Sequence, residues 1–304
     1  MSLLTSWLAS PLPDAAIEIA PDRVSAATLA VGGGSPRLQN RGAEALPADA
    51  IAPSLNVHNI LDKEAVVGAV RAVLGRLGTR VARAAVVIPD LAGKVSVVRF
   101  ERVPPRRDDL DQLVRWQIRK ALPFPVEDAC VTYTVGRRGP EGTEFIVVAA
   151  RRQVVSEYEE VCAAAGVHAG LVELATFSVL NLTLATTGAA GTAGDWLVVH
   201  MRPEYTSVAI VRDGDLIFFR NRPEGDEGSL PDVVHQTAMY YQDRLEGQGF
   251  RRVLLGGSGG GAGAFEAARQ NLEERLGTTV EPIDPAEAPL AGVLLRARHE
   301  AMGV

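Results

Sequence analysis

The same order of predicted strands and helices occurs on both sides of a small-residue stretch at 186–195, and this repetition constrains the fold most. The stretch reads TTGAAGTAGD, with three glycines and no hydrophobic periodicity, which is typical of a linker or loop between two packed units. The chain of 304 residues also has about the length of two domains. We therefore expect one domain at 1–187 and a second at 196–304.

The second half has the clearer pattern. Asp213 and Gly214 predict a two-residue hairpin between two runs of apolar and β-branched residues. Ser229 is expected to cap the helix that follows, because it precedes an apolar face with helical spacing. The predicted elements are strands at 196–201, 205–211 and 216–220, a helix from 229 to about 246, a strand at 253–255, a helix at 264–276, a strand at 278–283 and a helix at 286–302.

The first half repeats this order and contains one insert, at about 93–150. Asp62 is expected to cap its first helix, whose apolar positions extend to residue 77. The other predicted elements are strands at 15–19, 24–31, 38–46, 84–88 and 167–174 and helices at 152–165 and 176–184. The insert itself predicts a strand at 95–103, a helix at 108–122 and strands at 130–135 and 144–149.

Each half therefore reads as a βββαβαβα unit, and the first half carries an additional β/α insert. Two such units in succession describe an α/β protein with a duplicated ribonuclease-H-like fold, the architecture of actin-like ATPases and sugar kinases. The alternative is a pair of unrelated α/β domains joined by the linker. The duplicated fold is our prediction.

Composition excludes several classes of function. The chain has 31 Lys and Arg against 37 Asp and Glu, a net charge of −6, so general electrostatic binding to nucleic acid is not expected. Cys130 and Cys162 form no C-x-x-C pair, which argues against a zinc site or a disulfide framework and suits a reducing cytosol. No apolar run approaches the roughly 18 residues of a membrane span, and the first residues lack the features of a secretion signal. We expect a cytoplasmic protein.

One segment carries a family resemblance. Residues 116–133, WQIRKALPFPVEDACVTY, resemble the helix, the I-P-F-P step and the following strand of PilM, the actin-like cytoplasmic component of type IV pilus machines. Shorter similar segments follow the same order along nearly the whole chain. They are AIEIA at 16–20, VVAARR at 147–152, the segment 165–173, LLGG at 254–257 and AGVLLR at 291–296. The second half differs in lacking the long insertion that the family usually carries after its third strand.

The resemblance implies a function and a partner. It implies a scaffold of a type IV pilus, or of a related type II secretion machine, that binds the short cytoplasmic N-terminal segment of the membrane protein PilN. Other components of the pilus machine are implied as partners too. The protein would then lie at the inner membrane through its partner and would have no membrane span of its own.

The hairpins that bind phosphate in actin-like ATPases are altered here. The usual first pattern is D-x-G-[ST], in which the aspartate holds Mg²⁺ through water and the turn presents backbone N–H groups. The matching stretch runs from Glu18 to Asp22, where Ala20 replaces the glycine and Pro21 removes an N–H. In the second hairpin the pattern corresponds to 200–202, so that His200 replaces the aspartate and Arg202 replaces the glycine.

A glycine-rich stretch at 256–263 is the third nucleotide element. It fits G-x-G-x-x-A, but too few residues follow to complete a dinucleotide-binding domain, and it has no G-K-[ST]. It suits the adenine-side loop of an actin-like fold, and it suits a flexible strand-to-helix turn equally well. The candidate nucleotide site is therefore a degenerate one, formed by Glu18, Arg202, Gly256, Gly257, Gly259 and Gly260. We expect no ATP hydrolysis, no catalytic residue and no protein metal site, while binding of ATP with Mg²⁺ stays open.

The insert is the candidate surface for a partner. At about 100° per residue, Trp116 lies far from the apolar stripe of the helix at 108–122. The candidate partner-binding residues are Trp116, Leu122, Pro123, Phe124 and Pro125, because exposed aromatic residues dominate many interfaces. The alternative is that both aromatic side chains pack between the insert and the first half.

Two other functions compete with the scaffold. One is an ATP-binding switch of the same fold, as in FtsA or a sugar kinase, which would need Glu18 and the glycines at 256–263 to hold Mg-ATP. The other is a filament-forming relative of actin. The scaffold is our prediction.

Overall fold

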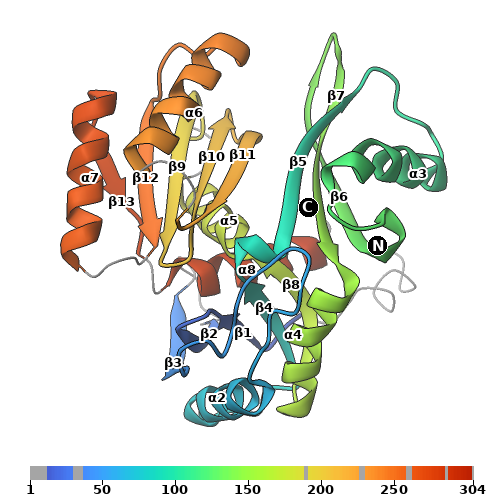
Figure 1. Cartoon of the computed structure of the whole chain (residues 1–304), viewed down its shortest axis with the longest axis vertical. Helices are drawn as coiled ribbons and strands as arrows, with labels where there is room; N and C mark the ends of the chain where they lie inside the picture. The colour runs from blue at the N-terminus through green and yellow to red at the C-terminus, as the bar shows by residue number, and fades with distance from the viewer. Residues whose placement is uncertain are drawn as a thin grey trace. The chain divides into compact units, whose positions relative to one another are not determined.

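The structure is a computed structural model that describes residues 12–29, 37–187, 191–225, 230–257, 262–284 and 287–302. These residues form two compact units, each assembled from segments that are distant in the sequence (Figure 1). The first unit takes its described residues from 12–92, 152–186 and 287–302. The second takes them from 93–151 and 187–284, so the insert belongs to the second unit.

The first unit contains a five-stranded mixed sheet in the order β3-β2-β1-β4-β8. β1 pairs antiparallel with β2 and parallel with β4, and β4 pairs parallel with β8. Its strands are β1 (Ala15–Ile19), β2 (Arg23–Leu29), β3 (Leu38–Ala45), β4 (Arg83–Ile88) and β8 (His168–Leu174). Its helices are α2 (Lys63–Arg76), α4 (Arg152–Ala164), α5 (Ala175–Thr187) and α8 (Ala288–Met302).

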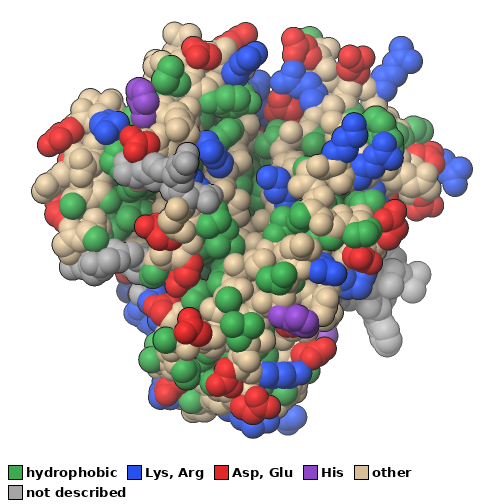
Figure 2. All heavy atoms as spheres, viewed as in Figure 1, with side chains coloured by type: hydrophobic (Ala, Val, Ile, Leu, Met, Phe, Trp, Pro, Cys, Tyr) green, Lys and Arg blue, Asp and Glu red, His purple; other side chains and the backbone are tan. Residues whose placement is uncertain are grey.

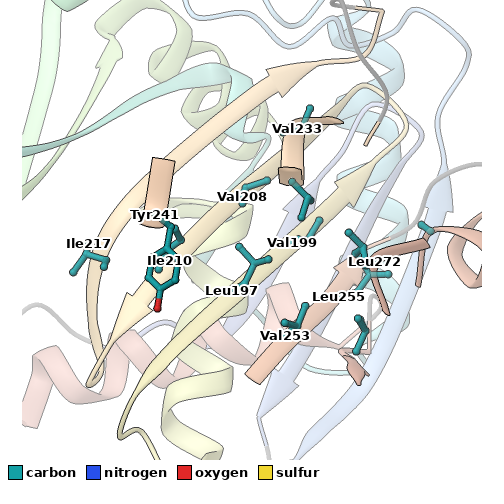
Figure 3. Close-up of a cluster of buried hydrophobic side chains, with 13 residues drawn as sticks. Leu197, Val199, Val208, Ile210, Ile217, Val233, Tyr241, Val253, Leu255 and Leu272 are labelled. Carbon is teal, nitrogen blue, oxygen red and sulfur yellow. The ribbon is translucent and has the colours of Figure 1, made fainter. Parts of the chain in front are cut away.

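The second unit repeats this sheet in the order β11-β10-β9-β12-β13. Its strands are β9 (Asp195–Arg202), β10 (Tyr205–Arg212), β11 (Asp215–Pro223), β12 (Arg252–Gly257) and β13 (Val280–Pro282), and its helices are α6 (Leu230–Arg244) and α7 (Ala262–Leu276). Alternate strand residues such as Leu197, Val199 and Val208 share one face, because successive side chains of a strand point to opposite faces. Figure 3 shows these side chains with those of α6, and together they form the buried core of this sheet.

The insert forms a separate three-stranded antiparallel sheet in the order β5-β7-β6. Its elements are β5 (Gly93–Phe100), α3 (Arg107–Ile118), β6 (Ala129–Gly139) and β7 (Gly142–Arg151). The hydroxyl of Tyr133 on β6 donates a hydrogen bond to Asp111 of α3, and the Tyr133 ring meets Phe145 of β7 at 5.9 Å. α3 therefore lies against the face of the sheet from which Tyr133 projects.

The fold predicted from the sequence is confirmed, because the two sheets share one strand order and the insert lies where the pattern placed it. Asp62 caps α2 as expected, with its carboxylate accepting a hydrogen bond from the Ala65 N–H at 2.9 Å. The Asp213–Gly214 hairpin has φ of 53° and 92°, the left-handed pair that such a turn requires. The predicted cap Ser229 lies outside the described residues, as do residues 30–31 and part of the linker, 188–190.

The helix of the insert ends earlier than the sequence predicts. The α-helix stops at Ile118, and a 3₁₀ turn at Arg119–Ala121 follows it. Leu122 then has an extended backbone, with φ −100° and ψ 138°. The ring of Pro123 accounts for the extended Leu122, because a proline disfavours the helical conformation in the residue before it.

Helix α8 follows the second sheet in the sequence but packs in the first unit. Its side chains Leu290, Val293 and Leu294 share a buried cluster with Ala16 and Val87 of the first sheet. Hydrogen bonds add to this packing, because Arg296 donates to the buried carboxylate of Glu173 on β8. The last helix therefore belongs to the first unit. The sequence-based division had assigned it to the second half, 196–304.

Candidate functional site

The insert has a positive charge balance in a chain of negative net charge. Residues 93–151 contain 11 Lys and Arg against 8 Asp and Glu, a balance of +3, while the whole chain has −6. Figure 2 shows Lys and Arg side chains, with Asp and Glu side chains among them, over the part of the molecule that holds β5, β6, β7 and α3.

Trp116 is exposed on the outer face of α3. Its side chain is 58% exposed, and the guanidinium of Arg119 lies 5.4 Å from the centre of the indole ring. Val114 and Ile118 are the buried residues of this helix, so the apolar stripe faces the sheet and leaves Trp116 on the other side. The position agrees with the sequence-based expectation of an aromatic residue off the core face.

The segment after α3 divides into buried and exposed residues. Leu122 and Phe124 are 9% and 7% exposed, whereas Pro123 and Pro125 are exposed. The guanidinium of Arg151 lies 5.9 Å from the centre of the Phe124 ring. The two apolar side chains therefore pack inside the insert. Of the five candidate partner-binding residues, Trp116, Pro123 and Pro125 are the exposed ones.

A groove opens between α3 and β6 in the same insert. Its volume is about 470 Å³, which lies within the range of ligand-binding pockets. The groove is lined by Pro104, Pro105, Arg107, Leu110, Asp111, Arg115, Val131, Thr132 and Tyr133. Burial raises the pKa of Tyr133, and its hydrogen bond to Asp111 raises the pKa further. The phenol therefore stays protonated and remains a donor at neutral pH.

The first phosphate hairpin is closed by its own hydrogen bonds. The Ala20 N–H donates to the Arg23 carbonyl at 2.9 Å, and the Asp22 carbonyl accepts from the Leu46 N–H. None of residues 20–22 has a positive φ, and Pro21 has no N–H to offer. Glu18 lies in β1 and is 2% exposed. The turn therefore lacks the row of free N–H groups that holds a phosphate.

The second hairpin is a tight turn in which the strand pairing continues to Arg202 and Tyr205. His200 is buried, lies opposite Ser207 in the strand register, and meets the Tyr205 ring edge-on at 6.4 Å. Arg202 is only 5% exposed. His200 therefore occupies a strand position inside the sheet, and the turn offers an arginine where an actin-like ATPase has a glycine.

The described part of the glycine-rich stretch has a packing role. Gly257 has a φ of +103°, and a Cβ added there would lie 1.8 Å from the carbonyl oxygen of Met201 on β9. A Cβ at Gly256 would lie 3.2 Å from the side chain of Ile283. These glycines therefore let β12 approach its neighbours. Gly259 and Gly260 lie outside the described residues, so their assignment to a nucleotide site stays a prediction.

Asp195, the acidic residue at the start of β9, belongs to a structural network. Arg212 donates to its carboxylate through Nε and Nη2, and the Tyr241 hydroxyl donates to it at 2.6 Å. Burial alone would raise the pKa of Asp195, but these hydrogen bonds lower it below the usual value. Among the described residues, no group of three His, Cys, Asp or Glu side chains is arranged to hold a metal ion.

Two features of the structure have no clear signal in the sequence. Asp90 is fully buried and accepts hydrogen bonds from the N–H and hydroxyl of Thr176 at the start of α5. In the sequence Asp90 is a single acidic residue after the buried strand 83–88. Such residues are too common to predict a contact 86 residues away. The groove beside β6 had no motif, because its lining comes from three separate segments.

The described helices include none that is both long and apolar enough to cross a membrane. Over residues 16–243, the chain matches the model of a protein family described as type IV pilus assembly protein PilM. This match covers most of the chain, including the first hairpin, the insert and the second hairpin.

Two solved structures are similar to the whole chain. A PilM–PilN type IV pilus biogenesis complex matches with a TM-score of 0.76 at 16% identity, covering 96% of this chain and 98% of that one. A protein of unknown function from Bacteroides thetaiotaomicron, with an actin-like ATPase fold, matches with a TM-score of 0.54 at 10% identity, covering 98% and 99%. At these identities the similarity shows the fold, which is that of actin-like ATPases.

Proposed function

The chain belongs to the PilM family of type IV pilus assembly proteins, and we propose that it is a scaffold that binds the short cytoplasmic N-terminal segment of a PilN-like inner-membrane protein. The structural similarity to a PilM–PilN complex supports this partner. The exposed Trp116 on the insert supports the place of contact, because tryptophan is among the residues that contribute most binding energy in protein interfaces. In this proposal the protein stays at the inner membrane through its partner.

The scaffold acts without hydrolysing ATP. The first hairpin is the main support for the absence of hydrolysis. There the Ala20 N–H already donates to the Arg23 carbonyl, and Pro21 has no N–H. The second hairpin adds a buried histidine and arginine at the positions of the metal-facing acid and the turn glycine. A site built in this way has lost the groups that position Mg²⁺ and the phosphates.

Mg-ATP is expected to raise the melting temperature by less than 1 °C at millimolar concentration, because the hairpins offer it few contacts. A ligand at 100 times its Kd adds about 2.7 kcal/mol, which would give a shift of several degrees in a protein of this size. Differential scanning fluorimetry with and without Mg-ATP measures the shift, and ATP without Mg²⁺ is the control. A rise of several degrees that needs Mg²⁺ would favour a nucleotide-binding switch.

Replacing Trp116 by alanine is expected to weaken binding of the partner segment about thirtyfold and to leave the melting temperature unchanged. Truncating an aromatic hot spot costs about 2 kcal/mol or more, whereas an exposed side chain contributes little to stability. Calorimetric titration of a synthetic peptide with the partner's N-terminal sequence measures the affinity. Gln117→Ala, the exposed neighbour of Trp116, is the matched control and should bind as the wild type does.

Phe124 needs a different interpretation in the same experiment. Its side chain is buried, so Phe124→Ala should lower the stability by about 3–5 kcal/mol whether or not Phe124 touches the partner. Unchanged affinity in Trp116→Ala, with an intact fold, would place the partner site away from the outer face of α3.

A further inference from the structure

We draw no further inference here: the strongest candidate, the exposed apolar patch that Met239 and Tyr240 of α6 form beside Phe218 of β11, carries no proposal because nothing in the structure shows what covers it.

Discussion

Gly257→Ala is expected to destabilise the second unit by more than about 4 kcal/mol, because the new methyl group has no space. A Cβ at this position would lie 1.8 Å from the Met201 carbonyl oxygen and 2.8 Å from the Met201 nitrogen. Both atoms belong to the backbone of β9, which is paired with β12 and cannot rotate away. The φ of +103° adds strain for any residue with a side chain.

Chemical denaturation followed by circular dichroism measures this loss, and Gly263→Ala is the matched control. Gly263 lies in the first turn of α7 with nothing within 4 Å of the added Cβ, so alanine there should not lower the stability. If Gly257→Ala were as stable as the wild type, β12 would not approach β9 as the structure has it.

Gly292→Ala is expected to lower the free energy of unfolding by about 3 kcal/mol, although alanine is the better helix former. Gly292 lies in α8, and an added Cβ would lie 1.7 Å from the carbonyl oxygen of Ser178 on α5. The two helices therefore touch through their backbones at this point. Alanine would force them apart and disturb the buried cluster that α8 shares with the first sheet.

Gly68→Ala is the control for this variant, because Gly68 lies in α2 with nothing within 4 Å of an added Cβ. Equilibrium unfolding in urea should show the two variants moving in opposite directions. A stabilising Gly292→Ala would mean that α8 does not pack against α5, and the assignment of the C-terminal helix to the first unit would be wrong.

The sequence predicts the order of elements well because its signals are local. Asp62 and the Asp213–Gly214 pair fix a cap and a turn through contacts within a few residues. Periodicity likewise placed Trp116 off the apolar stripe of α3, where the structure exposes it. Signals of this kind depend on neighbouring residues and can be read without the tertiary structure, so the duplication was visible in the chain.

The rest depends on contacts between distant segments. The apolar pattern of α8 predicts a buried face but not the sheet that buries it, and only the structure places Leu294 beside Ala16. Leu122 and Phe124 follow the helix, so helical periodicity does not predict whether their side chains are buried or exposed. The structure buries both. The groove is a third case, because whether β6 is an edge strand depends on the order of strands in the sheet.

We propose that this PilM-family chain binds a membrane partner's segment and that nucleotide plays no part in the binding. Calorimetric titration of the PilN-like N-terminal peptide into the full chain, with and without millimolar Mg-ATP, tests it most directly. We expect a saturable 1:1 heat with the same affinity in both conditions. No binding in either condition, or binding that appears only with Mg-ATP, would contradict it.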